Sequence, residues 1–376
     1  MDFAYSDEQS MLRDSVDRFG QDEWPAAGRL KNLAEGPGGA RRRWRAMADL
    51  GWLMLPITEQ DGGLGGGPVE IMALMEGFGR HLIPAPYVSS CILVPALVAG
   101  DPAAADLLVA IGAGSASAAA ALVEAQGGDD PCWVETLAER DGNGWRLTGV
   151  KPHVEDGADA DWFVVSARTH GAPDDREGIG LFLIPRGTAG LGVECFRAID
   201  AHRHARLVLE SAAATQIGNP AGAMPTIEFA IDRAICAQLA EATGSMEAAA
   251  AATLDYLRTR QQFGVPIGSF QALQHRMVDM TIACEEARAM TYHATLSLGR
   301  HAHERRRAVS AGKVRVGQSG VYVAQQAVQL HGGVGFSDEL IVSHHLRRQM
   351  MLDLAHGGAD HHRSVYAAAR FADEAA

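Results

Sequence analysis

Two turns that join a histidine to a pair of glycines carry the residue types best suited to chemistry in this sequence. One is QLHGG (329–333) and the other is LAHGG (354–358). Adjacent glycines let backbone N–H groups approach a phosphate closely because no Cβ intervenes. Imidazole side chains bind metals or accept protons near neutral pH. Glycines also end helices, so these turns alone leave a phosphate cradle, a metal site and a helix cap open.

The histidines and cysteines do not have the spacing of metal ligands. The His-His pairs at 344–345 and 361–362 point in different directions on a helix, and no H-E-x-x-H pattern occurs. The cysteines contain no CxxC pair, so the sequence predicts neither a zinc site nor a disulfide framework. We expect no bound metal, and we expect buried free thiols at cysteine positions 91, 132, 195, 236 and 284.

A basic turn at YLRTRQQFG (256–264) offers a second kind of chemistry. Arg258 and Arg260 end a predicted helix, and Phe263 and Gly264 follow in the turn. The planar fork of an arginine matches pyrophosphate, and a phenyl ring can lie against an adenine or a ribose. A solvated arginine pair at a helix C-terminus, where cations are favoured, is the alternative.

The elements that must position these turns fall into three blocks. Residues 1–115 are predicted to be helical, beginning at a capping box formed by Ser6 and Gln9. Residues 116–222 contain short β-rich runs with no helix between them, which indicates an antiparallel barrel or sandwich. Residues 223–376 are long helices joined by short loops, the last from Asp338 to Gly357, which is typical of a four-helix bundle. The predicted fold class is α+β with three domains.

Composition excludes several classes of protein. The formal net charge of -13 argues against a nucleic-acid-binding protein, because such modules carry a basic face. No run reaches the ~20 apolar residues of a membrane span, and the N-terminus lacks the charged start and apolar run of a signal peptide. The glycine-rich stretch EQDGGLGGGPVE (59–70) follows no predicted strand, so we interpret it as a loop. We expect a cytoplasmic protein.

The motifs of the whole chain resemble those of the acyl-CoA dehydrogenase family. R-x-x-F-G-x-x-I-x-x-F-Q begins at Arg260, Q-L-H-G-G-x-G begins at Gln329, and W-x-L-T-G-x-K and A-D-W-F-V-V-S-A-R stand in the middle block. IEFAIDRAICAQLAEATGSMEA and FGVPIGSFQALQHRMVDM are most similar to the small subunit of pimeloyl-CoA dehydrogenase and to the paired-subunit dehydrogenases of steroid side-chain breakdown. The resemblance implies FAD as the cofactor, α,β-dehydrogenation of an acyl-CoA substrate, and electron-transfer flavoprotein or a similar acceptor.

The same resemblance implies a flavin site that is shared between chains. In this family QLHGG lies at the pyrophosphate and adenine end of a flavin that is reached from the neighbouring subunit. The protein is then expected to be a homo- or hetero-oligomer, a dimer or tetramer, with a sister subunit. The positions that match those contacting this half of FAD are Arg260, Gln262, Phe263, Gln271, Gln329, Gly332 and Gly333.

The segments that match the flavin-ring side depart from the family pattern. The T-E-P-x-x-G-S-D stretch of the family, which packs against the ring edge and the substrate, reads VEAQGGDDP (123–131) here. In the W-x-T-N-G stretch the tryptophan is replaced by His153 and the threonine by Glu155. A carboxylate beside reduced flavin is repelled unless it is protonated. We therefore expect that this chain keeps the residues that contact the adenine half of a flavin bound by the neighbouring subunit. We expect its residues on the flavin-ring side to have changed.

The catalytic base of the family is also replaced. Dehydrogenation beside a thioester needs a carboxylate to take the α-proton while a hydride leaves for the flavin. His356 stands where most members have this glutamate, and Ala234 stands where some others have it. Glu241 lies two helical turns beyond Ala234 among small residues, which should raise its pKa, and the similar paired-subunit dehydrogenases have a glutamate there. Glu241 is the preferred base and His356 the alternative, with a structural role open for each.

Three hypotheses of function stay open at this point. The chain is a complete acyl-CoA dehydrogenase, or a non-catalytic partner that completes FAD sites on a sister subunit, or a flavin oxidase or monooxygenase on the same fold. A yellow protein whose flavin is bleached by acyl-CoA would support the complete dehydrogenase. A protein that turns yellow only with a partner chain would support the non-catalytic partner. Reduced flavin that reacts with oxygen, without oxidation of a thioester, would support the oxidase or monooxygenase.

Overall fold

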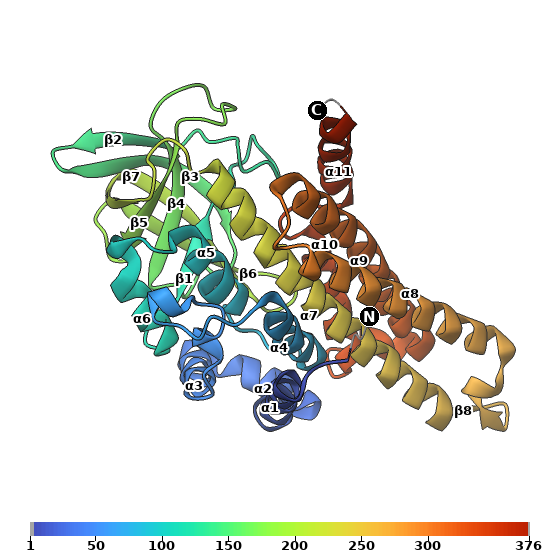
Figure 1. The fold of residues 1–376 in the computed structure, drawn as a ribbon. Coiled ribbons are helices and arrows are strands. Elements are labelled where there is room, and N and C mark those ends of the chain that lie inside the picture. Colours follow the sequence, from blue (N-terminus) through green and yellow to red (C-terminus); the bar gives the residue numbers. More distant parts are fainter. Residues whose placement is uncertain (1–3, 375–376) are drawn as a thin grey trace. The chain divides into compact units, whose positions relative to one another are not determined.

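The computed structural model describes residues 4–374, which form two compact units (Figure 1). The helical unit contains the residues up to Gly36, Pro68–Ile83 and the chain from Ile235 onward. The β unit contains Pro37–Gly67 and Pro84–Ala234. Helices, then strands, then helices follow one another along the chain, so the predicted fold class is confirmed. The three domain boundaries given by the sequence stay a prediction.

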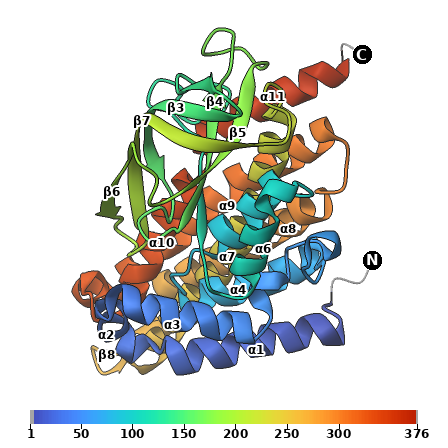
Figure 2. The same ribbon diagram turned by 90° about the vertical axis from the view of Figure 1, so that its left-hand side faces the viewer.

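A closed, mostly antiparallel barrel forms the centre of the β unit. Its strands are β1 (Ala118–Ala121), β2 (Leu137–Asp141), β3 (Gly144–Val154), β4 (Trp162–Arg168), β5 (Ile179–Pro185), β6 (Leu191–Arg197) and β7 (Arg203–Ile217). Pairing runs β2–β3–β7–β5–β4 and returns from β4 to β2, where Leu137 faces Arg168. β1 pairs with β4 in parallel, and β6 pairs with the first half of the long strand β7 (Figure 2).

Alternating side chains fill the inside of this barrel. Leu147, Phe163 and Leu207 are fully buried in one cluster, and Trp145 meets Phe182 edge to face with 5.3 Å between ring centroids. Such period-2 burial is what the β-rich runs of the sequence predict. The helices of the β unit are α3 (Gly36–Asp49), α5 (Val94–Val98) and α6 (Ala105–Gly112).

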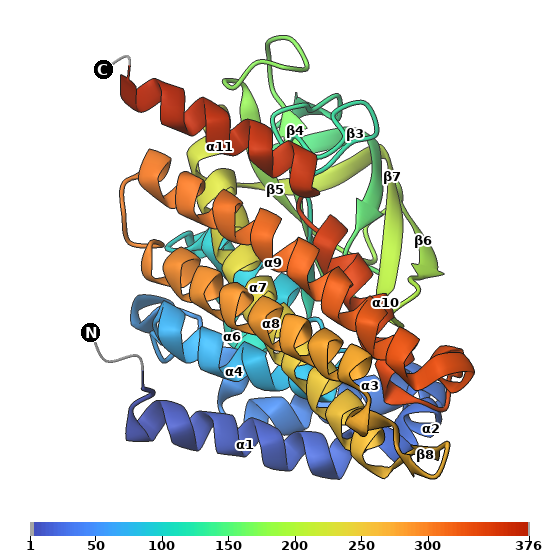
Figure 3. The same cartoon turned by 90° about the vertical axis from the view of Figure 1, so that its right-hand side faces the viewer.

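Long helices build the helical unit (Figure 3). They are α1 (Asp7–Glu23), α2 (Arg29–Ala34), α4 (Pro68–His81), α7 (Met224–Thr259), α8 (Gln271–Leu296), α9 (Ala302–His331), α10 (Ile341–Leu354) and α11 (Ala359–Glu374). The first part of α7, up to Ala234, belongs to the β unit. α1 begins at the predicted capping box, in which Ser6 Oγ accepts from the Gln9 N–H at 3.3 Å. α9 packs against α8 on one side and against α10 and α11 on the other. Over residues 4–374, no helix is both long and apolar enough to cross a membrane.

The last predicted helix is shorter than expected, and a further helix follows it. α10 ends at Leu354 rather than at Gly357. His356 and Gly357 then adopt φ values of 55° and 104°, which are left-handed conformations that cannot continue a helix. The alanine-rich segment beyond this reversal forms α11, which packs against α9. The prediction of four helices after residue 223 is therefore one helix short.

Cys195 differs from the predicted burial of the cysteines. Cys91, Cys132, Cys236 and Cys284 are buried, and none of the five is in a disulfide. Cys195 is exposed because it lies in β6, a strand that pairs with β7 alone and leaves most of its side chains in solvent.

Helices α4 and α7 cross at two glycines. A Cβ on Gly79 would lie 1.8 Å from the carbonyl oxygen of Glu241, and a Cβ on Gly244 would lie 1.9 Å from that of Glu76. Both neighbours are backbone atoms, which cannot turn away as a flexible side chain can. The helices approach this closely only because both positions lack a Cβ, and the crossing fixes where Glu76 and Glu241 stand.

Replacing Gly244 by alanine should lower the free energy of unfolding by about 1–3 kcal/mol, because the new methyl group overpacks a backbone contact. Gly299→Ala is the matched control, since a Cβ at Gly299 would meet nothing within 4 Å. Urea unfolding of the two variants beside the wild type measures the difference. Equal stability of the two variants would contradict the close crossing.

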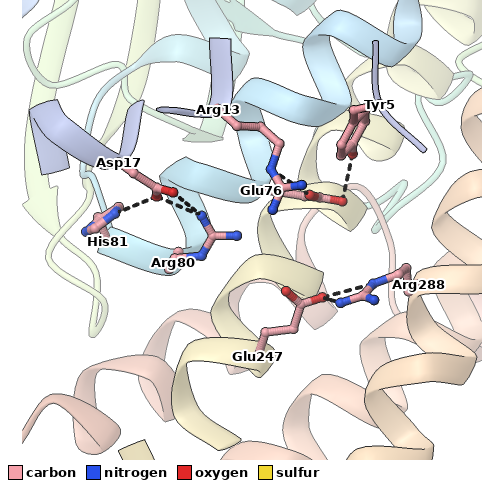
Figure 4. Close-up of polar contacts among 8 residues, drawn as sticks. All are labelled: Tyr5, Arg13, Asp17, Glu76, Arg80, His81, Glu247 and Arg288. Carbon is pink, nitrogen blue, oxygen red and sulfur yellow. Dashed lines mark hydrogen bonds and ion pairs between the residues drawn. The ribbon is translucent and has the colours of Figure 1, made fainter. Parts of the chain in front are cut away.

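Glu76 lies in a buried polar cluster beside this crossing (Figure 4). Its Oε1 accepts a hydrogen bond from the Tyr5 hydroxyl at 3.0 Å, and its Oε2 lies 3.9 Å from Arg13 Nε. Burial and then the negative charge of Glu247 raise the pKa of Glu76 above its ordinary value of 4.5. Arg288 Nε in turn donates to Glu247 Oε1 at 3.1 Å. The folded protein therefore favours the protonated form of Glu76 more than water does.

Because its folded-state pKa is raised, Glu76 stabilises the fold fully below its unfolded pKa and loses this contribution as the pH rises through the folded pKa. Glu76→Gln keeps an acceptor for Tyr5 and carries no charge to desolvate. The melting temperature of this variant relative to wild type should therefore rise as the pH increases from 4.5 upward.

Thermal melts across this pH range test the prediction. Glu8→Gln, at an exposed acid of α1, controls for the loss of one negative charge. A melting-temperature difference for Glu76→Gln that does not depend on pH would show that Glu76 does not titrate in the way its burial predicts.

Candidate functional site

A two-residue hairpin follows α7 and carries three of the predicted flavin contacts. β8 (Gln261–Gln262) and β9 (Val265–Pro266) pair antiparallel, and Phe263 and Gly264 between them have φ values of 54° and 80°. Positive φ at both central positions is typical of a tight type I′ turn. The turn leaves the Phe263 side chain 91% exposed and edge to face with Phe270. The three contacts on or next to this hairpin are Arg260, Gln262 and Phe263.

The QLHGG turn ends α9 beside the end of α7. The His331 ring stacks on Tyr256 of α7 with 4.4 Å between ring centroids. Burial lowers the pKa of His331, so the stacked ring is neutral near pH 7. Gly332 follows with a φ of 69°, and a Cβ on Gly332 or Gly333 would meet nothing within 4 Å. The histidine of this turn is thus a packing residue, and its glycines face open space.

These residues fit the adenine and pyrophosphate half of FAD. Arg260 is exposed and has no ion-pair partner among the described residues. An exposed guanidinium, an exposed phenyl ring and two uncovered glycines therefore meet at one end of the helical unit, which is the set a nucleotide diphosphate requires. Gln271 at the start of α8 and Gln329 in the last turn of α9 are exposed at this end too.

Glu241, the preferred base, is not surrounded by apolar groups alone. The side chain is buried in α7, and its two oxygens accept hydrogen bonds from Arg348 of α10, from Nε at 2.6 Å and from Nη2 at 2.8 Å. Besides the small residues that the sequence places near Glu241 on α7, a guanidinium therefore lies against the carboxylate, and a structural role for Glu241 stays open. Two charge-assisted hydrogen bonds occupy oxygen lone pairs that a general base would use.

His356, the alternative base, lies in the reversal between α10 and α11. Its backbone is left-handed, with a φ of 55°, and its carbonyl oxygen is 3.0 Å from His362 Nε2. Burial lowers the pKa of His362 to about 3, so that ring is neutral and donates to the carbonyl from Nε2. LAHGG is thus a helix-to-helix turn held by a neutral histidine. Across residues 4–374, no group of three or more His, Cys, Asp and Glu side chains has the arrangement of a metal site.

The segments matching the flavin-ring side lie in the β unit. His153, near the end of β3, is exposed and lies against His204 with 4.8 Å between ring centroids. Phe196 of β6 lies 5.8 Å from the His204 ring and 6.1 Å from the His153 ring, measured between ring centroids. Glu155 is half-buried directly after β3. Where the family has tryptophan and threonine, this chain therefore has a cluster of two histidine rings and a phenylalanine ring, followed by a carboxylate.

The buried charged partners of the helical and β units are not predicted by the sequence. Arg348 stands 107 residues from Glu241, and Lys151 pairs with Glu124 at 2.7 Å inside the barrel. Arg168, at the end of β4, is 2% exposed. The available signal was a single charge within an apolar run, as in AAALVEA for Glu124 or FVVSAR for Arg168. Such a charge predicts a buried partner without saying which one.

Known proteins resemble this chain along nearly its whole length. It is 27% identical to the probable acyl-CoA dehydrogenase YngJ of Bacillus subtilis over 98% of this chain and 99% of the relative. A variant of the Tcur3481-Tcur3483 steroid ACAD matches with a TM-score of 0.87 at 27% identity, covering 98% of this chain and 99% of that one. The ChsE4-ChsE5 complex from Mycobacterium tuberculosis matches with a TM-score of 0.86 at 26% identity, covering 97% of each chain.

Family models agree with these relatives in all three parts of the chain. The N-terminal domain of acyl-CoA dehydrogenase matches residues 6–106, the middle domain matches 119–212, and the C-terminal domain matches 226–370. Together the matches cover most of the sequence in the order helices, barrel, helices. The chain belongs to the acyl-CoA dehydrogenase family, a family of FAD-dependent oxidoreductases.

Proposed function

We propose that this chain is an FAD-dependent acyl-CoA dehydrogenase that oxidises the Cα–Cβ bond of an acyl-CoA thioester within an oligomer. The observation that carries the proposal is the surface at the end of α7 and α9. There Arg260, Phe263 and the glycines 332 and 333 converge without covering side chains from their own unit. A surface with these groups left open is suited to a nucleotide cofactor held between chains.

The residues of this surface have separable tasks. Arg260 supplies a planar, permanently charged donor fork for the two phosphates. Phe263 offers an uncovered ring on which adenine or ribose can lie. The glycines let backbone approach the phosphates where a Cβ would stand in the way. When bound, the flavin accepts a hydride from the β-carbon of the substrate, and the protein must take the α-proton.

Glu241 is our proposed acceptor of that proton. Its pairing with Arg348 fixes the position of the carboxylate on α7. The same pairing favours the second candidate function, a non-catalytic partner that completes FAD sites on a sister subunit, because a carboxylate bound on both oxygens is a poor base. His356 serves less well, since it occupies a turn between helices. No feature of the described residues favours a flavin oxidase.

Oligomerisation has support from exposed apolar side chains on the helical unit. Val278 and Ile282 are four residues apart on α8 and are 56% and 53% exposed. Met350 and Leu354 repeat this spacing on α10. Apolar side chains at helical spacing favour packing against another helix, so we propose a dimer or tetramer, with a second copy or with a sister subunit. The proposed electron acceptor is electron-transfer flavoprotein or a similar protein.

Arg260→Ala should weaken FAD binding without lowering the melting temperature of the apoprotein. A charge-assisted phosphate contact contributes roughly 1.5–3 kcal/mol, which corresponds to about 10- to 150-fold in the dissociation constant. FAD retained after extensive dialysis, measured by absorbance, gives the result. Arg258→Ala, two residues earlier and also exposed, is the control that should retain wild-type flavin. Equal FAD retention by both variants would remove Arg260 from the site.

Glu241→Gln should slow the bleaching of the flavin by acyl-CoA by at least ~100-fold if Glu241 takes the α-proton, because the basic oxygen is lost while the shape is kept. FAD and acyl-CoA should still bind. His356→Gln should leave the bleaching rate nearly unchanged. Stopped-flow absorbance of the assembled protein measures each rate.

Two other outcomes would revise the assignment of the base. Loss of bleaching in His356→Gln with normal bleaching in Glu241→Gln would make LAHGG the active turn. Normal bleaching in both variants would locate the base on another chain, and this protein would then be the non-catalytic partner.

A further inference from the structure

A partly buried arginine of the β unit has few partners for its charge. Arg233 lies in the first part of α7, which belongs to this unit. Its Nη2 donates to the Pro56 carbonyl at 3.3 Å, and within residues 4–374 the guanidinium makes no other hydrogen bond and no ion pair. A guanidinium offers several N–H donors in a fixed fork, so most of the donors of Arg233 lack a protein partner.

Other arginines of the β unit show how this charge is usually satisfied. The buried Arg168 donates to six backbone carbonyl oxygens, among them that of Val134 at 2.9 Å. Arg206, which is more exposed, donates to both oxygens of Glu194 at 2.8 Å. In the described part of the chain, Arg233 has neither a carboxylate nor a set of carbonyls around it. A charge that is taken from water and only partly bound is costly, which indicates a missing partner.

The open nitrogens of Arg233 can be reached from outside the protein. Nε and Nη1 make no hydrogen bond in the described structure, yet neither atom is sealed from solvent. The residue as a whole is only partly exposed. The guanidinium is therefore recessed but accessible, which suits a small ion better than a large protein surface.

The groups beside Arg233 carry no charge at neutral pH. Burial raises the pKa of the Tyr87 phenol well above its ordinary value, and its hydroxyl donates to the Trp52 carbonyl at 2.8 Å. Burial also raises the pKa of the nearby Cys91 thiol. The pKa of Arg233 itself is lowered by burial, since no described carboxylate offsets the lost hydration. An anion here would meet one positive charge in a surrounding of low dielectric, where their attraction is stronger than in water.

A single guanidinium selects a planar anion with one negative charge. The Pro56 carbonyl takes one N–H of Nη2, so one of the two parallel donor pairs of the guanidinium stays open. Such a pair matches the two oxygens of a carboxylate. A phosphate monoester carries a charge of about −1.5 to −2 at pH 7, and no second cationic side chain of the described residues acts on Arg233. The geometry therefore favours a carboxylate over a phosphate.

We propose that Arg233 is the centre of an anion-binding site in the β unit that takes a carboxylate group. This carboxylate has two sources, a free small carboxylate ion and the far end of an acyl group that itself ends in a carboxylate. Only the second source rests on the proposed function, because the free ion binds without a thioester.

Arg233→Met tests the site, because methionine fills a similar space without a charge. In the FAD-loaded full chain, sodium acetate in place of sodium chloride at equal ionic strength should raise the melting temperature of the wild type. A ligand that binds only the folded state stabilises it, so the shift should vanish in Arg233→Met. Arg206→Met, which removes an arginine paired with Glu194 at 2.8 Å, is the control and should keep the acetate shift.

Two acyl-CoA probes of equal chain length distinguish the sources. Hexanoyl-CoA ends in a methyl group and adipoyl-CoA ends in a carboxylate, and isothermal titration gives their dissociation constants. Binding of adipoyl-CoA that is tighter by about tenfold or more, with the preference lost in Arg233→Met, assigns the carboxylate to the acyl group. Equal binding of the two probes together with the acetate shift assigns the site to a free ion.

Absence of the acetate shift in the wild type, together with equal binding of the two probes, overturns the proposal. If Arg233→Met does not fold, Arg233→Lys keeps the charge without the parallel donor pair, and it should weaken whichever effect the wild type shows. An unchanged effect in Arg233→Lys would then overturn the proposal. A wild type that binds neither acyl-CoA refutes the proposed function, and the acetate shift alone decides whether the site exists.

Discussion

The buried ion pair between Glu241 and Arg348 is the interaction on which the helical unit most depends. It joins the middle of α7 to α10, and two neutral contacts flank it, Ser245 Oγ to His345 Nδ1 at 2.8 Å and Gln349 Nε2 to the Ala242 carbonyl at 2.7 Å. Burial lowers the pKa of His345 to about 3, so the flanking ring carries no charge. Removing one member of a buried pair typically costs 3–5 kcal/mol because the other charge is left unpaired.

This pair also limits what chemistry α7 can perform. A carboxylate with a free lone pair can accept a proton, whereas the Glu241 carboxylate already accepts two hydrogen bonds from a guanidinium. The contact that fixes α7 against α10 therefore uses the same two oxygen atoms that the proposed base would need. For this reason the role of Glu241 distinguishes the proposed enzyme from a partner subunit.

The sequence predicts the parts of the structure that depend on neighbours in the chain. The capping box at Ser6 and Gln9 needs only residues three apart, and the turn at Phe263 and Gly264 needs only one short motif. Arg348 could not be assigned to Glu241 in this way, because the pair is set by how α7 and α10 pack and not by any spacing. An isolated charged residue in an apolar run predicts a buried partner. The identity of that partner follows only from how the helices and strands pack.

Other differences from the sequence predictions have the same origin. Ending the last helix at Gly357 was reasonable from LAHGG, yet the left-handed turn at His356 allows the chain to reverse and form α11 on α9. Cys195 was expected to be buried by residue type, and its exposure follows from the edge position of β6. Residue type gives the average burial of a cysteine, while the pairing of strands decides the burial of this one.

The length of helix α7 separates Glu241 from Arg260, two residues of the candidate site. Arg260 lies 19 residues after Glu241 (260 − 241), which at 1.5 Å per residue corresponds to about 28 Å along the axis. A rigid helix carries no hinge that could bring these two residues together, so Glu241 and Arg260 of one chain lie far apart. The uncovered Phe263 ring is consistent with this geometry, because an aromatic side chain left 91% exposed at the tip of a hairpin is available to a ligand shared with another chain. Helix α7 thus leads into an exposed hairpin at its C-terminal end, while its centre is held against α10 by the pairing of Glu241 with Arg348.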